Sequence, residues 1–581
     1  MSRRRRERLP ATTTAPNLFP WPWAIFGAAL AIRLFYWRAT ADSAWPHSAG
    51  FKGDALLWLE YARALREGLP FELGLPIHPP GTAYLVAALW SGSGGFGLLK
   101  AVWCALGAAA AALSSAAIAR AFGAIAGAIA GVVMAGSSGL LMLSTSLNGE
   151  TPYLALVAAG FWFLPGVADV PAAPRLMAWA ALQGVACLFR VEHVLFVVLA
   201  LAFMAVRALR RGSLRHAAVV VSVATGAFVL PLVPWHMSAW RAVARFNGEA
   251  PVTPPPVRSV LEQLRWIAWE PEARARLEAL PAFARDHSEV FVAATVAYRG
   301  GTRIREADLE VLREAFGVEV LRLRPRPFIS LYGPLNFALA SHPDAPAGFG
   351  HAALDIPPPL AGGPGAFPAT LVTGLPPREL ALTYPPHLAL VNDGYEMGWR
   401  WLAAEPGRAV RRGLTRLARF WAGAATTVTG YGLPVGLSGT RNAVDLTVAD
   451  GWLAAAWRIV LFGVCLAGVA AGCTRAALYP WLFFLATKAA AAVAFFGYAR
   501  LGATTIPVVA LLAALAIERW WPVRTDGQRR RGAGTALAML VAIEAGRCLH
   551  QPGLALDGDA AGPQDPVPSA DHLGHQLRIV R

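Results

Sequence analysis

The sequence predicts an all-α polytopic membrane protein, and three observations carry this prediction. Of the 581 residues, 56% are hydrophobic and only 15% are charged, whereas soluble domains carry about 25% charged residues. Long apolar blocks recur along the chain, and about 20 apolar residues suffice for one helix to cross a bilayer. Arginines gather at the ends of these blocks, as the positive-inside rule expects. We therefore expect about 11–13 transmembrane helices and one large external loop domain.

The apolar blocks define the expected helices. In chain order they are residues 21–37, 82–91, 96–119, 122–147, 150–166, 176–206, 216–236, 452–472, 478–497, 501–517 and 534–547. Blocks 122–147 and 176–206 are longer than one span needs. Each of these two is therefore either one long helix or two short ones.

Arginine clusters set the expected orientation in the cell inner (cytoplasmic) membrane. The cluster at residues 3–8 places the N-terminus in the cytoplasm, with the first helix retained as an uncleaved anchor. The loop at 40–80 then lies outside. A second inside cluster at 207–215 makes block 216–236 cross outward.

Four parts of the chain follow from this topology. Residues 1–236 form an N-terminal transmembrane module that contains the first external loop. Residues 237–408 form an external (periplasmic) domain rich in Pro and Gly. Residues 409–550 hold a juxtamembrane helix and the C-terminal transmembrane helices. Residues 551–581 form a flexible tail of Gly, Pro and Asp.

Composition argues against several kinds of partner. The net charge of +16 lies at the ends of apolar blocks and not in a basic groove interleaved with aromatic residues, so we expect no nucleic-acid partner. The five cysteines lie in or beside apolar segments without CxxC spacing, which argues against a disulfide framework or a metal site. Asp557-Gly558-Asp559 has the DxD spacing of metal-dependent transferases, but its place in the tail makes it incidental.

The most informative candidate is Asp54. It lies in the first external loop, directly before a helical run that ends near Gly68, and His78-Pro79-Pro80-Gly81 follows ten residues later. An acid at a membrane face is costly and is usually kept for a task. Two interpretations stay open: Asp54 is a catalytic base, or it caps the following helix. His78 is either a second polar group of the same site or part of a turn.

Other ionisable residues interrupt apolar blocks. Glu150, Arg190 and Glu192 are of this kind, and such groups face a cavity or pair with one another. Either glutamate could hold an acceptor group or fix an arginine. Arg500 stands at the outer end of block 501–517, where it could meet a phosphate or extend to the membrane surface.

Residues 408–419 predict an amphipathic helix at the membrane interface. Arg412 and Arg416 repeat at helical spacing on one face, with Leu414 and Leu417 on the others. These arginines are candidates for binding lipid phosphate. A solvated face over lipid head groups is the alternative.

Several segments together resemble a known family. They are, in order, Gly53-Asp54, His78-Pro79-Pro80-Gly81, Asn148-Gly149-Glu150-Thr151-Pro152-Tyr153, Leu188-Phe189-Arg190-Val191-Glu192, Pro234-Trp235, 330–337, 343–349, 401–406 and Gly497-Tyr498-Ala499-Arg500 with Ile506-Pro507. Their order and topology resemble the membrane-embedded glycosyltransferases of the GT-C fold, above all glycosyltransferase family 39, which includes protein mannosyltransferases and aminoarabinose transferases. The chain departs from the family pattern at Leu57 and Trp58, where a Tyr is usual, and at Tyr498, which precedes Arg500 instead of following it.

The resemblance implies a donor sugar on a polyprenyl phosphate and an acceptor hydroxyl or amine outside the membrane. Asp54 would be the base, and Arg500 and Tyr498 would meet the lipid phosphate. A lipid phosphate leaves readily, so one base is enough, unlike the acid and base of a glycosidase. No cofactor is required, although a divalent metal ion is compatible with this chemistry. The alternatives are a transporter or flippase for lipid-linked sugars and a non-catalytic envelope-assembly protein.

Overall fold

The structure is a computed structural model, and it describes part of the chain. The described residues are 21–41, 55–69, 71, 74–90, 96–164, 173–211, 214–248, 264–280, 285, 288–289, 292–293, 296, 301–309, 323–324, 327–345, 352–354, 380–382, 385–429, 452–497, 499–520 and 579–580. Asp54, Tyr498 and block 534–547 lie outside these residues.

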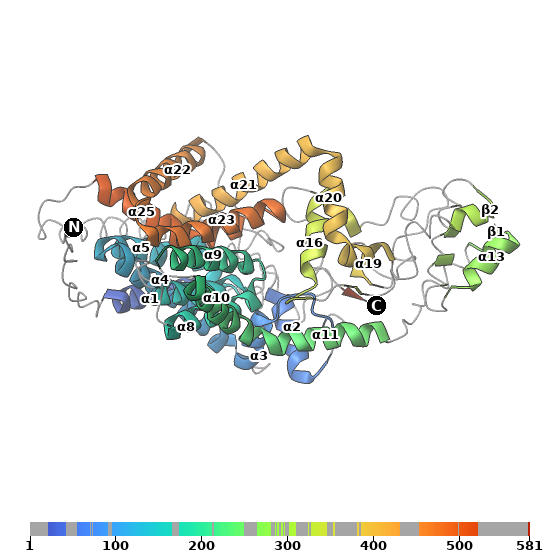
Figure 1. Cartoon of the computed structure of the whole chain (residues 1–581), viewed down its shortest axis with the longest axis horizontal. Coiled ribbons are helices and arrows are strands. Elements are labelled where there is room, and N and C mark those ends of the chain that lie inside the picture. The colour runs from blue at the N-terminus through green and yellow to red at the C-terminus, as the bar shows by residue number, and fades with distance from the viewer. Residues whose placement is uncertain are drawn as a thin grey trace, which may run out of the picture.

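A helical bundle forms one half of the molecule (Figure 1). Its N-terminal helices are α1 (Trp21–Ala41), α3 (Gly81–Leu89), α4 (Phe96–Phe122), α5 (Ala124–Gly136), α6 (Ser138–Thr145), α7 (Glu150–Phe163), α8 (Ala173–Phe189), α9 (His193–Arg211) and α10 (Leu214–Val229). Its C-terminal helices are α22 (Trp452–Gly472), α23 (Tyr479–Ala494), α24 (Ala499–Ala503) and α25 (Ile506–Trp520). Each predicted apolar block that falls within the described residues is helical.

Five helices of the described chain are long and apolar enough to cross a membrane, as expected of an all-α polytopic membrane protein. They are 97–122, 193–210, 214–248, 454–472 and 476–494, and the bent pair α5–α6 makes a sixth if it counts as one span. This is about half the predicted number. The difference arises because several blocks form short helices, such as the 14-residue α7 and the 15-residue α25, and about 20 residues are needed for a full crossing.

Both long blocks form two helices. Block 122–147 becomes α5 and α6, which meet at Ser137 with a bend of 56°. Gly123 separates α5 from α4 with φ of +115°, a conformation that favours glycine. Block 176–206 becomes α8 and α9, and the break between them holds Arg190 and Glu192. The second break therefore places charged side chains between two apolar helices.

Close helix contacts rest on small residues. A Cβ on Gly423 would collide with the backbone of Ala499, and one on Gly468 would collide with the backbone of Leu512. The large buried core of the bundle is correspondingly rich in alanine and includes Tyr153, a residue of α7. Backbones that approach this closely are typical of helix packing in membranes.

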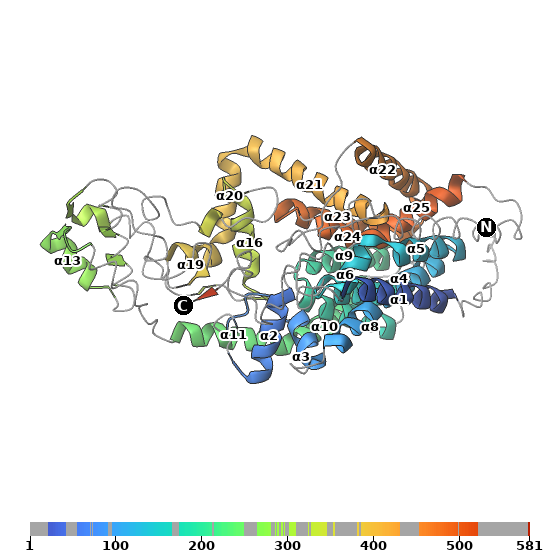
Figure 2. The ribbon, with the colours of Figure 1, turned by 180° about the vertical axis from the view of Figure 1, so that it is seen from behind.

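Helix α2 (Ala55–Glu67) follows the position of Asp54. Its buried face, including Trp58, forms a small core with α3, Trp103 and Leu147. Figure 2 shows α2 and α3 beside α11. They lie at the end of the bundle that faces the described residues between 264 and 404, here called the outer domain. The segment predicted as the first external loop is thus packed on the bundle through most of its described residues.

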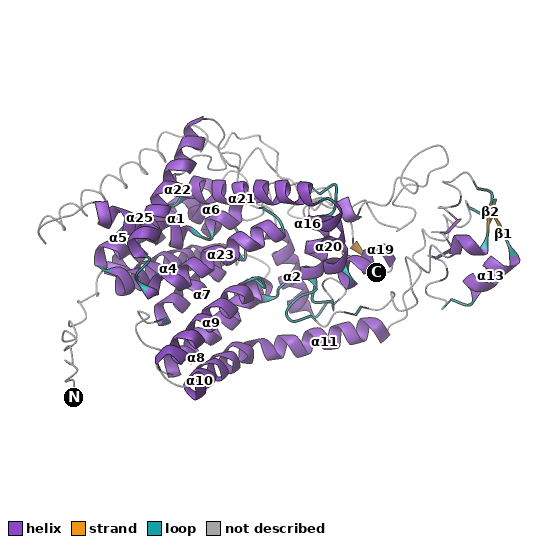
Figure 3. Cartoon of the chain, turned by 45° about the horizontal axis from the view of Figure 1, so that its top comes forward, coloured by secondary structure: helices purple, strands orange, loops and turns teal. Residues whose placement is uncertain are grey.

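The helix at the end of the predicted N-terminal module continues past residue 236. Helix α10 continues through the 3-10 turn η3 (Leu230–Leu232) into α11 (Val233–Gly248), which projects from the bundle as a rod (Figure 3). Pro234 lies in the first turn of α11, where its missing N–H costs no hydrogen bond. The described helix therefore crosses the predicted domain boundary by 12 residues (248 − 236).

The outer domain is small and mostly helical where it is described. Its elements are β1 (Ala268–Trp269), α13 (Pro271–Glu278), β2 (Arg303–Ile304), α16 (Tyr332–Ser341), η5 (Ala352–Leu354), β3 (Leu380–Ala381), α19 (Pro385–Asn392) and α20 (Gly394–Ala404). β1 pairs with β2, and β3 with β4 (Ile579–Val580), both in parallel. A separate core of leucines joins α16 and α19 to the loop at Leu75 and Ile77.

Helix α21 (Pro406–Thr429) connects the two halves of the molecule and begins beside the predicted boundary at 408. Val410 and Leu414 are exposed, as on the predicted amphipathic helix, whereas Arg416 is buried. The second half of α21 runs into the bundle, where Thr427 accepts a hydrogen bond from Ser137 at the α5–α6 bend. Large exposed apolar side chains are thus confined to the first half of the helix, and its place at a membrane interface stays a prediction.

Candidate functional site

Five charged residues from separate segments form one ion network. Glu150 begins α7, Arg190 follows α8, and Glu192 precedes α9. Lys488 lies in α23 and Arg500 in α24. The sequence predicted four of these five as site residues, and the structure brings all four together.

Glu150 is shared by two arginines. Its Oε1 lies 2.5 Å from Arg190 Nη2 and 3.6 Å from Arg500 Nε. The Glu150 side chain is only 3% exposed. A buried carboxylate is costly unless it is paired, so these two cations account for its presence here.

Glu192 extends the network to the C-terminal helices. Lys488 Nζ donates to Glu192 Oε1 at 3.1 Å, and Arg190 Nε lies 3.7 Å from the same oxygen. Arg190 thus bridges the two glutamates. Among the described residues the network holds three cations and two carboxylates, which gives a net charge of +1.

Exposure divides the network into a closed and an open side. Glu150 and Lys488 are each 3% exposed, whereas Arg500 is 12%, Arg190 22% and Glu192 23% exposed. The positive groups at the open side can therefore be reached by an anionic ligand, and the buried groups hold them in place.

Local sequence explains the positions of Glu150 and Arg190. Asn148 Oδ1 accepts from the backbone N–H of Thr151 at 3.1 Å, which closes the turn before α7. Glu150 then occupies the first turn of α7, where the helix dipole favours an acid. Arg190 follows the last turn of α8, and its backbone N–H bonds to Ala186 at 3.0 Å. The dipole of α8 favours a cation there.

A chain of hydrogen-bonded neutral side chains packs against Lys488. Tyr153 Oη lies 2.8 Å from His193 Nδ1, and His193 Nε2 lies 2.7 Å from Gln183 Oε1. An amide oxygen only accepts hydrogen bonds, so His193 donates one from Nε2. Its Nδ1 then accepts a hydrogen bond from the Tyr153 hydroxyl. The Tyr153 ring in turn lies 4.2 Å from Lys488 Nζ, at cation–π distance.

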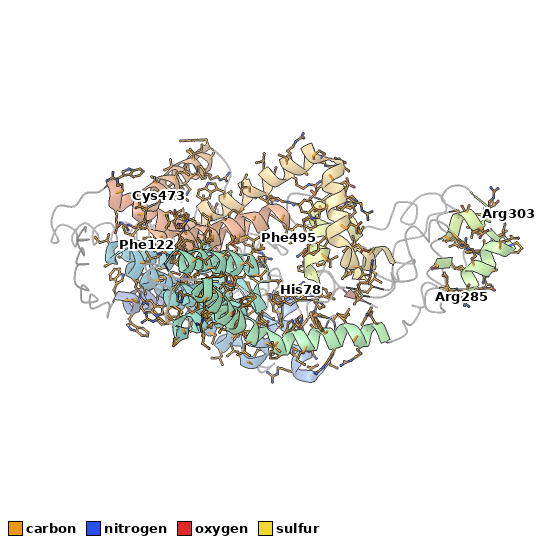
Figure 4. All side chains as sticks on the ribbon, in the orientation of Figure 1. His78, Phe122, Arg285, Arg303, Cys473 and Phe495 are labelled. Atoms are coloured by element: carbon orange, nitrogen blue, oxygen red, sulfur yellow. The ribbon has the colours of Figure 1, made fainter. Side chains whose placement is uncertain are left out.

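The His78-Pro79-Pro80-Gly81 segment adjoins this region. Gly81 packs against the backbone of Leu188, two residues before Arg190, and Gly149 packs against Thr82. His78 is buried between the rings of Trp58 and Tyr332, at centroid distances of 6.1 and 4.6 Å. Figure 4 places His78 and Phe495 at the end of the bundle that faces the outer domain, opposite Phe122 and Cys473. These aromatic contacts give His78 a packing role at that junction.

Arg412 and Arg416 bind backbone carbonyls. Arg412 donates to His342 O at 2.8 Å and Pro343 O at 2.6 Å, beyond the end of α16. Arg416 donates to Ala340 O at 2.5 Å and to Val493 O at 3.1 Å. Burial, with the charge of Arg412, lowers the pKa of Arg416 to about 10. These contacts favour helix capping, and phosphate binding by the two arginines stays a prediction.

Lys488, Tyr153, His193 and Gln183 were not among the predicted site residues. A signal existed for Lys488, because a lysine in the middle of an apolar block is rare and usually functional. Gln183 lies inside block 176–206 and offers the same signal more weakly. Within the described residues, no group of three or more His, Cys, Asp or Glu side chains could hold a metal ion.

Comparison with protein-family models, with curated proteins and with solved structures finds no match. The chemistry of the site therefore has to be argued from its own residues.

Proposed function

We propose that this chain is a membrane glycosyltransferase of the GT-C fold. It moves a sugar from a polyprenyl-phosphate-linked donor to an acceptor hydroxyl or amine on the outer face of the cytoplasmic membrane, with the N-terminus inside. Asp54 acts as the base, and Arg500 with Arg190 meets the lipid phosphate. The acceptor is a glycan, a lipid or a protein.

The convergence of the ion network carries the proposal. Three segments that resemble family motifs, at Glu150, at Arg190–Glu192 and at Arg500, meet through direct ion pairs. The excess positive charge on the open side suits a phosphate, and guanidinium groups match phosphate geometry. If the network served only structural ion pairing, equal numbers of cations and carboxylates would be enough, and the third cation would have no role.

The proposed reaction is a single displacement at C1 of the sugar. The acceptor oxygen or nitrogen attacks C1 and forms the new bond. The bond from C1 to the phosphate oxygen breaks, and its electron pair stays on the departing lipid phosphate. Asp54 takes the proton of the acceptor. Charge grows on the phosphate during this step, so cations already in place lower the barrier.

Glu150 and Glu192 act as positioning residues in this scheme. Glu150 holds Arg190 and Arg500 side by side, and Glu192 ties Arg190 to Lys488. Preorganised cations need no reorganisation when charge develops. Removal of either glutamate would loosen the arginines without removing a group that touches the sugar.

The proposal is tested in two steps. Mass spectrometry of envelope glycans and lipids, from cells with and without the gene, identifies the product that depends on the chain. Purified protein in liposomes is then assayed for that product, with the lipid extract of the deletion cells as substrate source. We expect Asp54→Asn to lower the rate by about 10²–10⁴-fold. Glu67→Gln, at the exposed end of α2, is the matched control, and full activity of Asp54→Asn would refute the proposal.

One observation favours a second candidate, a flippase for lipid-linked sugars. The 56° bend between α5 and α6 breaks a potential span in the described chain, and broken helices are typical of transporters. A fluorescent polyprenyl-phosphate sugar decides between the two functions. A flippase moves it between leaflets unchanged, whereas the transferase consumes it.

A further inference from the structure

A cavity separate from the ion network lies between α2, α3 and α11. It measures about 500 Å³, within the range of about 300–1,000 Å³ that is typical of small-molecule sites. Figures 1 and 2 show the three helices side by side. The loop from Gly68 to Pro76 closes one side of the cavity. None of the five charged residues of the ion network lines it.

The cavity is lined by aromatic residues and by small residues. Tyr61 stacks on Phe71 with ring centroids 4.3 Å apart, and Tyr84 meets Trp235 edge-on at 6.1 Å. Trp235 also begins the face of α11 that lines the cavity, and Ala242 follows two turns later on that face. The small alanine leaves the space that a larger side chain would fill.

The cavity spans the edge of the apolar layer. The continuous helical run 214–248 has 35 residues, which is about 52 Å at 1.5 Å per residue, well beyond a hydrocarbon core of about 30 Å. Trp235 lies at the end of the apolar block, and Arg245 follows about 15 Å further along the helix. Helical side chains lean toward the N-terminus of their helix, so the Arg245 side chain leans back toward the membrane.

Charge is concentrated at one end. Arg245 is the one charged side chain among the described residues that line the cavity, and it is exposed. At the opposite end the Tyr84 side chain is 51% exposed, so the aromatic part is open at its rim. The cavity therefore joins an aromatic slot, which also holds the Ser238 hydroxyl, to a single cation at one end.

We propose that this cavity binds an anionic membrane lipid. The phosphate of the head group pairs with Arg245, and an apolar chain lies against Tyr61, Tyr84 and Trp235. A zwitterionic lipid fits less well because its own ammonium group competes with Arg245 for the phosphate. The lipid site does not depend on the glycosyltransferase proposal, because it is defined by binding and not by transfer.

Photo-crosslinking tests the proposal on the full-length protein in nanodiscs. The probe is phosphatidylglycerol with a photoreactive group in its acyl chain, and phosphatidylcholine with the same group is the comparison. We expect the anionic probe to label residues 61–84 and 235–246, and the zwitterionic probe to label them several-fold less. Arg245→Gln should weaken labelling about fivefold, the equivalent of about 1 kcal/mol. Ala242→Trp should abolish labelling by filling the cavity.

Matched controls lie on the same helix. Arg241 and Ala244 are exposed and do not line the cavity, so Arg241→Gln and Ala244→Trp should label like the wild type. Equal labelling by both probes would rule out a preference for anionic lipid. An equal loss in Arg241→Gln would reduce the effect to general surface charge. Labelling that survives Ala242→Trp would place the lipid elsewhere. If Ala242→Trp fails to fold, the two arginine variants still decide.

Discussion

Two kinds of arginine coexist in this bundle, and they differ in burial and in the groups that they bind. Arg33 in α1 is fully buried and donates to Ala29 O at 3.0 Å, Ala135 O at 3.3 Å, Met134 O at 3.4 Å and Ser144 Oγ at 3.0 Å. Arg500 is partly exposed and lies against the carboxylate of Glu150. The first arginine holds the last carbonyls of α5 at the α5–α6 bend. The second has a charged partner that another anion can replace.

The contrast separates structural from functional charge. Backbone carbonyls are fixed by the fold, so an arginine that binds them stabilises one arrangement of helices. A carboxylate side chain can rotate away, so an arginine paired with it can exchange partners. Arg412 and Arg416 belong with Arg33 by this criterion, because they donate to backbone carbonyls. Arg190 belongs with Arg500.

Among the variants that test this contrast, loss of Arg500 should give the largest effect, and it should be an effect on rate. Arg500→Gln removes a cation that faces the proposed phosphate, so we expect transfer to fall about 10²–10³-fold. The thermal unfolding midpoint should change little. The exposed Arg519, in α25, offers Arg519→Gln as the control. A normal rate in Arg500→Gln would move this arginine into the structural class.

Loss of Arg33 should act in the opposite way. Arg33→Met leaves several buried carbonyls without their donor, and each unsatisfied group costs about 1–3 kcal/mol. We expect a loss of about 3 kcal/mol in unfolding free energy, read as a lower midpoint in detergent. Protein that remains folded should retain its transfer rate. A selective loss of rate at unchanged stability would contradict the structural assignment.

His387 extends the comparison to the outer domain. It is buried in α19 and lies 3.2 Å from Leu354 O, and burial lowers its pKa from 6.5 to about 4. The unfolded chain therefore binds a proton between these values and the folded chain does not. Stability is complete above pH 6.5 and falls as the pH drops toward 4, by on the order of 2 kcal/mol.

Hydrogen exchange of residues 385–392 at pH 7.5 and pH 5 would measure this loss. His387→Gln keeps a donor for the carbonyl and removes the titration, so it should flatten the pH dependence. The same slope in His387→Gln would assign the effect to another group.

Gly160 should give the smallest effect. A Cβ at this position would collide with the side-chain amide of Gln183, which is bonded to His193. Gly160→Ala should therefore cost about 1 kcal/mol of stability, the value of one hydrogen bond. It should also lower the transfer rate slightly through Lys488. Gly226, which has open space around it, provides Gly226→Ala as the control for helix propensity.

Much of the bundle was predictable because apolar length is written directly in the sequence. Blocks 122–147 and 176–206 could not be resolved into one helix or two, since their breaks depend on Ser137 and on Arg190–Glu192 finding partners elsewhere. The extension of α11 beyond residue 236 buries Val243 in one core with Leu75 and Leu323, and no local pattern records that packing. The core of the outer domain was not predictable either, because it gathers residues from distant segments, such as Leu75 and Leu388. Its external location stays a prediction.

The site was predictable by residue type and not by pairing. Glu150, Arg190, Glu192 and Arg500 are conspicuous because charge is rare in apolar blocks. Their partners lie far away in the chain, as Lys488 does from Glu192, by 296 positions, and Arg500 does from Glu150. Periodicity carries no information at that range. The helical spacing of Arg412 and Arg416 was equally clear, yet only the fold reveals the carbonyls that they bind.

Arg190 touches both glutamates, so events at the two ends of the network are thermodynamically linked. An anion bound at Arg500 would change the strength of the Lys488–Glu192 pair by some factor. Breaking that pair must then change the affinity for the anion by the same factor. If an anion binds there, Lys488 in α23 affects its affinity without touching it. The size of that effect is a coupling energy, which anion titrations of the Lys488→Met, Glu192→Gln and double variants would measure.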